Sequence, residues 1–304
     1  MENLMIYQTE LFVNNYFPEE QDLINSNQNQ YNDIEEKCFK YHYTNVESLK
    51  KILSTKKLRL MHYKYLNDTT EGKLIFDHLI KHSEADFVES LKILHQTIVN
   101  NFYVGSFSLF GNRLSQWRAY GNVCIGFDFN KMEYDLRFIE DLKGTQHVTS
   151  GLGFTKCDYI DTSIQDDINR IVEDIKNSFR DLSNMSLEDK SQFQYNALKL
   201  GLFLFGIKHI GFQEEHEYRI FHYLWKINPF KNERGKSYFN FIFKPEHVKR
   251  IVVGPSNQQD EIYKDIQKFK EQNILDYAHV EIYRSTIPFI DKKPNNCLKR
   301  TRTR

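Results

Sequence analysis

The stretch FKYHYTNVESLKKILSTKKLRL, residues 39–60, decides the fold that the sequence predicts. Its first five residues are aromatic and β-favouring, which is typical of a short strand. The next apolar residues recur at i, i+3, i+6 and i+7 on one helical face, at Val46, Leu49, Ile52 and Leu53. Thr44 or Asn45 can cap this helix by accepting a backbone N–H bond. Residues 58–62 then alternate as a second short strand.

Strands and helices follow one another without steady alternation along the rest of the chain. Strands are predicted at 102–109, 122–129, 154–160, 217–225, 238–243, 248–253 and 279–283. Helices are predicted at 70–101, 164–182, 187–208 and 260–271. This pattern favours an α+β fold with mixed, mostly antiparallel sheets flanked by helices. We expect a peripheral N-terminal segment and linker at 1–37, a single α+β catalytic-like domain at 38–290, and a basic C-terminal tail at 291–304.

Composition limits the classes of partner. The chain has 304 residues with 41 basic and 41 acidic side chains, a net charge of +0, so no global field draws it to nucleic acid or anionic lipid. The overall charge balance does not exclude a local basic patch. Cys38, Cys124, Cys157 and Cys297 show no metal or disulfide spacing, which predicts free thiols in a reducing cytosol and no metal site. The N-terminus lacks the order of a signal peptide, and no apolar run is long enough to span a bilayer, so we expect a cytoplasmic protein without a membrane partner.

His42 is the first candidate site residue. It lies between two tyrosines on a strand, so it points to the opposite face from both. A histidine in this position is more often structural than functional. Its functional value would be two ring nitrogens that can bond ribose hydroxyls at neutral pH.

The strand predicted at 102–109 carries the second candidates. Ser106 and Ser108 share its small, polar face, and small residues on a strand allow close approach of a ligand. The serines would orient a ligand amide, while Trp117 or Tyr120 would stack on a planar ring. The alternative is a core strand whose hydroxyls bond to backbone.

The third candidates lie in the acidic segment 213–220. On a strand, Glu215, Glu217 and Arg219 share one face. Two partly buried carboxylates raise each other's pKa, and Arg219 would offset that effect. A fixed carboxylate stabilises the positive charge that develops on ribose when an N-glycosidic bond breaks. The alternative is an edge strand with a charged, solvated face.

Together these stretches resemble a bacterial family known as domain of unknown function 2971. The resemblance covers about residues 39–290 and rests on motifs that this chain carries in order. They are the aromatic opening at 41–60, Asn67-Asp68 with Glu71, the Ser-Phe-Ser strand, Trp117 with Tyr120-Gly121 and Phe127-Asp128, Lys208 with Phe212, Glu215, Glu217, Tyr218 and Arg219, Ile-Val-Val-Gly-Pro at 251–255, and Ser-Thr-Ile-Pro at 285–288. The family name implies no activity.

The order of motifs also resembles, more distantly, that of ADP-ribosyltransferases, which implies a split sheet and an NAD site. Carried over, His42 and Thr44 hold the NAD ribose, Ser106 and Ser108 support the nicotinamide side, and Glu217 stabilises the developing charge. The chain mixes two subclasses, because a histidine opening usually accompanies an aromatic middle motif rather than Ser-x-Ser.

Three hypotheses follow. The first is an NAD-using ADP-ribosyltransferase-like enzyme, a toxin or phage-defence effector. Its catalytic residues are Glu217 and Glu215, and its cofactor-binding residues are His42, Thr44, Ser106, Ser108, Trp117, Tyr120 and Arg219. It would bind a nucleotide in a cleft, act on a nucleic-acid or protein acceptor, and be held by an antitoxin or regulatory partner. The second is a non-catalytic nucleotide- or protein-binding module. The third is a metal-dependent nuclease that uses Asp68, Glu71, Glu215 and Glu217.

Overall fold

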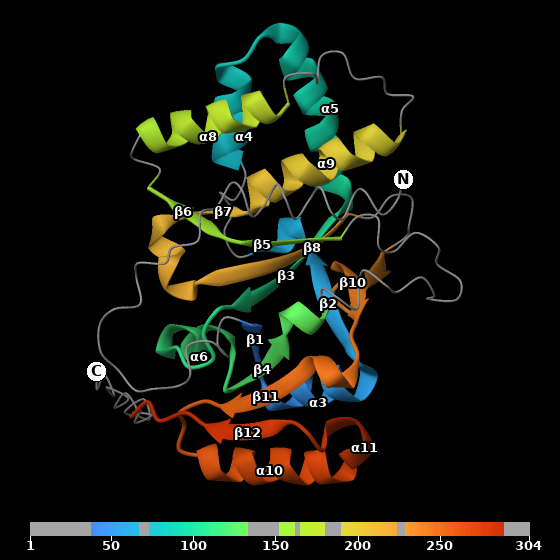
Figure 1. The fold of residues 1–304 in the computed structure, drawn as a ribbon, viewed down its shortest axis with the longest axis vertical. Helices are drawn as coiled ribbons and strands as arrows, with labels where there is room; N and C mark the ends of the chain where they lie inside the picture. The colour runs from blue at the N-terminus through green and yellow to red at the C-terminus, as the bar shows by residue number, and fades with distance from the viewer. Residues whose placement is uncertain are drawn as a thin grey trace, which may run out of the picture.

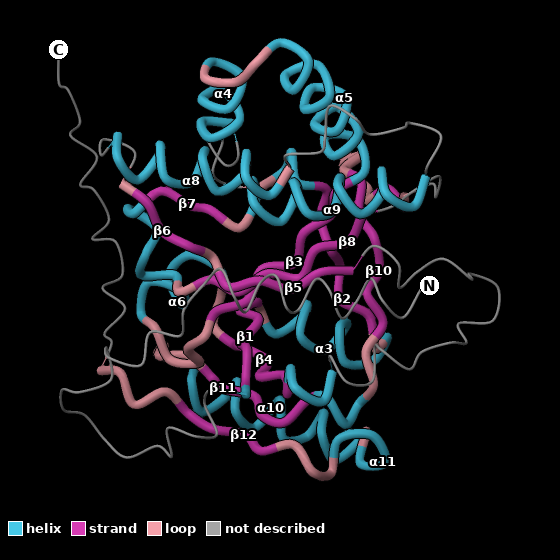
Figure 2. The backbone as a smooth tube through the Cα atoms, turned by 45° about the horizontal axis from the view of Figure 1, so that its top comes forward, coloured by secondary structure: helices cyan, strands magenta, loops and turns pink. Residues whose placement is uncertain are grey.

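The computed structural model describes residues 38–66, 73–132, 152–161, 165–179, 190–223 and 229–288. Within these residues, helices cover two ends of a mixed, mostly antiparallel set of strands (Figure 1; Figure 2). The predicted α+β class is therefore confirmed. The expected peripheral segment, 1–37, and the expected basic tail, 291–304, lie outside the described residues.

The elements are bounded as follows. The strands are β1 (Phe39–Thr44), β2 (Lys57–His62), β3 (Phe102–Ser108), β4 (Val123–Asp128), β5 (Leu152–Lys156), β6 (Asp158–Ile160), β7 (Ile207–His209), β8 (Glu217–Tyr223), β9 (Phe230–Lys231), β10 (Ser237–Ile242), β11 (Val248–Val253) and β12 (Glu281–Arg284). The α-helices are α3 (Val46–Thr55), α4 (Lys73–Lys81), α5 (Ala85–Asn101), α6 (Leu114–Tyr120), α8 (Gln165–Ser178), α9 (Lys190–Phe205), α10 (Gln259–Gln272) and α11 (Ile274–Tyr277). The 3₁₀ turns are η1 (Tyr63–Tyr65), η3 (Ile210–Glu215) and η4 (Pro245–His247).

The main sheet forks at β3. One edge of β3 pairs with β8 over its whole length, and β8 in turn pairs with β5. The other edge of β3 is shared, because β1 pairs with it at Ser108 and β2 pairs with it at Tyr103 and Val104. Beyond β1 lie β4, β11 and β12, whereas β10 and β9 lie beyond β2. Residues 105–107 of β3 consequently have no partner on that edge in any described strand.

Two apolar cores hold the two sides of the fork. The first lies under α4, α5, α8 and α9, where buried residues of α5 such as Leu94 and Ile98 pack with Phe102 of β3 and Phe221 of β8. Figure 1 shows these four helices together on one side of β3, β5 and β8. Burying a large apolar side chain contributes roughly 1.5–3 kcal/mol, so these contacts fix the helices on the strands.

The second core joins α3, α10 and α11 to the strands on the other side. Leu49 and Leu53 are the buried residues of α3, as the helical spacing predicts, and they pack in one cluster with Leu60 of β2, Ile125 of β4 and Ile266 of α10. Asn45 caps α3 by accepting a bond from the Ser48 N–H at 2.8 Å. The opening stretch therefore folds as predicted, with a strand, a helix and a second strand.

Some predicted elements differ from the observed ones. The helical region predicted to run to about Asn101 consists of two helices, α4 and α5, with a turn between them. The strand predicted at 154–160 is broken at Cys157, whose N–H donates to the carbonyl of Glu217 at 2.8 Å. The helix predicted to reach Lys208 ends at Phe205, and the next residues form β7, which pairs in parallel with β6. Neither of these two short strands has a hydrophobic alternation of its own.

Of the helices in the described ranges, none combines the length and the apolarity that crossing a membrane requires.

Candidate functional site

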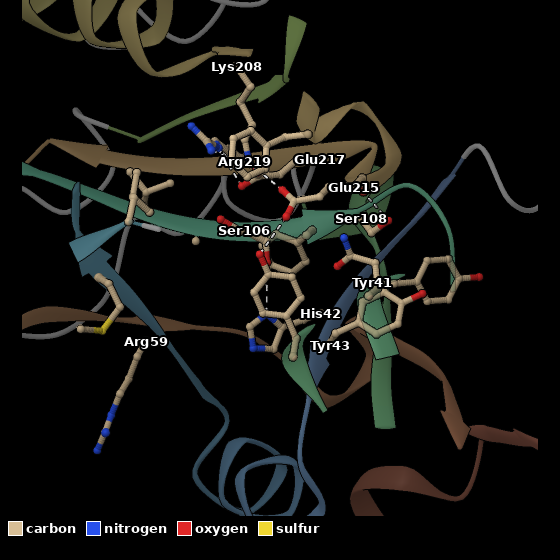
Figure 3. A pocket seen from close by; sticks show the side chains of 18 of the residues that line it. Tyr41, His42, Tyr43, Arg59, Ser106, Ser108, Lys208, Glu215, Glu217 and Arg219 are labelled. Atoms are coloured by element: carbon tan, nitrogen blue, oxygen red, sulfur yellow. Dashed lines mark hydrogen bonds and ion pairs between the residues drawn. The ribbon is translucent and has the colours of Figure 1, made fainter. Parts of the chain in front are cut away.

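A pocket of about 310 Å³ lies where β1 and β2 diverge from β3. Side chains from distant parts of the chain line it, as Figure 3 shows. They include His42, Arg59, Ser106, Ser108, Tyr120, Lys208, Phe212, Glu215, Glu217 and Arg219. The divergence of the strands leaves space at the fork, so the sheet itself creates the pocket.

Glu217, the first residue of β8, is the centre of an ionic cluster. Its Oε1 accepts from Arg219 Nε at 2.7 Å, and its Oε2 accepts from Lys208 Nζ at 2.7 Å and from Arg219 Nη2 at 2.9 Å. Arg219 Nη1 also donates to the Phe205 carbonyl at 2.5 Å. Glu217 is 4% exposed and Arg219 is 1% exposed. A buried charge requires such pairing, so the cluster is fixed in place.

The cluster sets the pKa of its members. Burial by itself would raise the pKa of Glu217, but the charges and hydrogen bonds of Arg219 and Lys208 prevail and lower it to about 2. Burial would also lower the pKa of Lys208, whereas the Glu217 carboxylate raises it above its ordinary value. Glu217 is therefore an anion, and Lys208 a cation, at any physiological pH.

Glu215 belongs to the same network but not to the strand. The prediction that Glu215 shares a strand face with Glu217 and Arg219 is wrong, because Glu215 ends η3 and His216 adopts the left-handed conformation, with φ at 42°. This turn still directs Glu215 into the pocket. Its Oε2 accepts from Lys208 Nζ at 2.5 Å, and its Oε1 accepts from the Tyr120 hydroxyl at 3.0 Å. Glu215 is half-buried, whereas Glu217 is buried.

His42 faces the fork from β1. Its Nδ1 lies 3.1 Å from the carbonyl oxygen of Ser106, and its ring lies 5.7 Å from that of Phe107. A carbonyl only accepts, so Nδ1 carries the hydrogen, and Nε2 of the neutral ring is an acceptor. Burial lowers the pKa of His42, partly offset by the Ser106 carbonyl. The neutral ring is therefore the form present near pH 7.

The two serines of β3 have different surroundings. Ser108 is buried, and its hydroxyl donates to the carbonyl of Glu215 at 2.9 Å and accepts from the Phe110 N–H at 3.2 Å. It thus fixes the end of η3. Ser106 is exposed at the fork, where its carbonyl orients His42.

Two of the predicted site residues do not line this pocket. Thr44 is buried at the end of β1, opposite Val123 of β4. Trp117 is buried against Tyr43, with ring centroids 4.5 Å apart, and its Nε1 donates to Asn112 Oδ1 at 3.2 Å. The Tyr43 hydroxyl in turn donates to the carbonyl of Phe110 at 2.7 Å and accepts from a backbone N–H of the segment that leads into α6. Trp117 thus contributes to the packing of α6, which carries Tyr120 to the pocket.

The glycine that follows α6 has a strict geometric role. Gly121 has φ at 138°, and a Cβ placed on it would lie 2.4 Å from the carbonyl oxygen of Thr44. Only glycine fits this close approach without strain. The Tyr-Gly pair that the sequence shows at 120–121 therefore joins a pocket residue to the turn that directs the chain into β4.

The structure adds residues that the sequence argument did not place at a site. Arg59, Met61, Tyr65 and Leu66 line the pocket from β2 and η1. Alternation along residues 58–62 indicates which side chains point outward, but nothing in the sequence shows that this face borders a pocket. Lys208 and Phe212 were visible in the family motif, without a role.

Of the four residues proposed for a metal-dependent nuclease, Glu215 and Glu217 line the pocket. Asp68 and Glu71 lie outside the described residues. Among the residues that are described, no group of three or more His, Cys, Asp or Glu side chains has the geometry of a metal site.

Comparison with known proteins gives one match. Residues 116–220 match the family described as "Protein of unknown function (DUF2971)". This segment runs from α6 to β8 and contains Tyr120, Lys208, Glu215, Glu217 and Arg219, so the match supports the family that the motifs predicted. No curated protein and no solved structure matches the chain.

Proposed function

We propose that the pocket at the fork binds NAD and that the protein is an NAD-using, ADP-ribosyltransferase-like enzyme. One observation carries the proposal. His42 is separated from Glu215 and Glu217 by more than half of the chain, yet all three line one pocket at the fork of a split sheet. This is the set of groups that the cleavage of an N-glycosidic bond requires, a holder for ribose and fixed carboxylates beside it.

The size and lining of the pocket fit part of a dinucleotide. Small-molecule sites have volumes of roughly 300–1,000 Å³, so about 310 Å³ accommodates one nucleoside half and leaves the other half in the open mouth. Tyr120 and Phe212 offer ring faces for a planar base or a nicotinamide. His42 Nε2, as an acceptor, suits a ribose hydroxyl.

The reaction itself needs a stable anion near the ribose. The bond from ribose C1′ to the nicotinamide nitrogen breaks, and nicotinamide leaves with the electron pair. An acceptor hydroxyl, amine or water then forms the new bond to C1′ and loses a proton. Positive charge develops on the ribose between these events, and a carboxylate stabilises it. Glu217, with its pKa of about 2, is ionised throughout.

The two carboxylates have different tasks in this proposal. Glu217 is buried and bonded through both oxygens, so it acts through its field and by holding Lys208. Glu215 is half-buried and bonded to Tyr120, so it is the carboxylate that orients an acceptor group.

A second candidate, a non-catalytic nucleotide-binding module, is favoured by one feature of the same cluster. Two cations compensate the charge of Glu217, as in a cluster that serves only to hold β7 and β8 together. In some proteins a buried ionic group specifies the structure without taking part in chemistry.

The experiment that distinguishes the enzyme from the non-catalytic module uses the full chain and NAD labelled in the nicotinamide ring. The enzyme hypothesis predicts release of free nicotinamide, measured by chromatography, and its loss in the Glu217→Gln variant. Glu215→Gln serves as a second variant, because Glu215 is less buried and the change disturbs folding less. Glu271→Gln, an exposed position on α10, is the matched control. NAD that binds tightly without any release of nicotinamide would reject the enzyme in favour of the module.

A further inference from the structure

The surface beside the pocket has a charge unlike that of the chain as a whole. Residues 57–66 and 229–242 together contain six Lys and Arg side chains, Lys57, Arg59, Lys64, Lys231, Arg234 and Lys236, and one acid, Glu233. Six positive charges against one negative give these two segments a net charge of +5, in a protein whose total is +0. The register of β2 and β10 places the two segments side by side.

Aromatic rings alternate with these cations. The Arg59 guanidinium lies 4.6 Å from the centre of the Tyr238 ring, and Tyr238 stacks with Phe230 at 5.6 Å. Lys64 and Lys236 lie 5.1 Å and 5.2 Å from the ring of Tyr65. We call these six residues, Arg59, Lys64, Tyr65, Phe230, Lys236 and Tyr238, the basic aromatic patch.

The patch is available to a partner and continuous with the pocket. Arg59, Lys64 and Lys236 are exposed, and Phe230 is 53% exposed. None of the three cations forms an ion pair with a carboxylate in the part of the chain that the structure describes. Arg59, which is labelled in Figure 3, also lines the pocket, and so does Tyr65. A ligand that lies across the patch would therefore reach the pocket mouth.

We propose that the basic aromatic patch binds single-stranded nucleic acid and presents it to the pocket. Charge complementarity selects a polyanion, because the patch offers cations that have no acidic partner among the described residues. The rings select the kind of polyanion, because stacking on an aromatic side chain requires an unpaired base, and each stacked base contributes about 1–3 kcal/mol. An acidic protein segment would pair with the cations but has no bases to stack on the rings. The binding claim stands without the NAD reaction, and only the naming of nucleic acid as the acceptor rests on the proposed function.

The test measures binding of the full chain, without NAD, to fluorescein-labelled single strands of about 15 nucleotides by fluorescence anisotropy. Three phosphate contacts on a single strand predict a slope of about −2 for the logarithm of the association constant against the logarithm of salt concentration. Affinity should then fall about 20-fold between about 50 and 200 mM salt.

Variants assign this binding to the patch. The double variant Arg59→Ala/Lys236→Ala should reduce the slope by about 1.4, since each lost contact removes about 0.7. Lys264→Ala/Lys268→Ala removes the same charge from the exposed face of α10 and should leave the slope unchanged. Phe230→Ala should weaken binding at least about 5-fold, whereas Phe230→Tyr, which keeps the exposed ring, should bind as the native protein does.

Four outcomes would overturn the proposal. They are no binding at the lowest salt concentration, an equal loss in the two double variants, equal competition by duplex of the same length, and equal displacement by polyglutamate. The last would mean that the patch takes any polyanion. Binding to single strands without nicotinamide release would reject the proposed enzyme and keep this inference. Nicotinamide release without binding of single strands would keep the proposed enzyme and reject this inference.

Discussion

Replacing Glu217 by glutamine should destabilise the fold, by an amount that the ionic cluster sets. The change keeps the shape of the side chain and removes its charge, so Arg219 and Lys208 lose the anion that compensates them. The pKa of Glu217 is about 2, compared with an ordinary 4.5. A difference of about 2.5 pKa units corresponds to about 3 kcal/mol at neutral pH, since each unit is worth about 1.4 kcal/mol. Breaking a buried pair by removing one partner typically costs a similar 3–5 kcal/mol.

The sign of the pH dependence is also fixed. Because the folded-state pKa is the lower one, the stabilisation is fully present above the ordinary pKa of 4.5 and is lost as the pH falls toward 2. The contribution should fall from about 3 kcal/mol at pH 7 to about 2 kcal/mol at about pH 3.5. The difference between the native protein and the variant should therefore narrow on acidification.

Urea unfolding followed by circular dichroism measures this difference at each pH, with linear extrapolation to water. Glu271→Gln on the surface of α10 is the control and should change the free energy of unfolding by no more than about 0.5 kcal/mol. A loss below about 1 kcal/mol for Glu217→Gln at pH 7, or a loss that does not change with pH, would refute the account of the cluster. The variant is thus a poor test of catalysis unless its stability is measured in parallel.

Three further predictions concern the elements around the pocket. Tyr43→Phe removes a hydroxyl that bridges two backbone groups beside α6, and should lower the free energy of unfolding in urea by about 1–2 kcal/mol; no loss would show that the bridge is not needed. Gly121→Ala places a methyl group against the Thr44 carbonyl at a positive φ and should cost about 1–3 kcal/mol or more in the same assay, whereas a neutral effect would contradict the observed geometry. His42→Gln should weaken the binding of NAD, measured by calorimetry. In the native protein that affinity should stay constant from pH 8 to about pH 6.5 and fall below it, because the pKa of His42 is lowered. An affinity that already falls above pH 7 would contradict a lowered pKa.

Much of the core could be predicted from local sequence. The face of α3 that bears Leu49 and Leu53, the cap at Asn45 and the strands at 102–108 and 248–253 follow from spacing that each segment carries itself. Such segments need no distant partner to reveal their periodicity.

The site could be predicted from the sequence only in part, because its geometry depends on long-range contacts. The candidate residues His42 and Glu217 could be named, since both belong to motifs. The left-handed turn at His216 could not, because a histidine adopts a positive φ too rarely for its presence alone to predict one. For the same reason the sequence placed Glu215 on a strand. The role of Lys208 as the shared partner of two carboxylates also emerges only when β7 is brought beside β8.

The fork at β3 has a consequence for how the pocket tolerates mutation. Alternation along the strand directs the amide and the carbonyl of Ser106 toward the gap between β1 and β2 rather than toward β8. Every amino acid except proline presents the same two groups. The floor of the pocket is thus formed by main chain, and it stays polar when almost any other side chain replaces that of Ser106. Substitutions among the side chains that line the rest of the pocket can therefore alter its specificity without removing these polar groups.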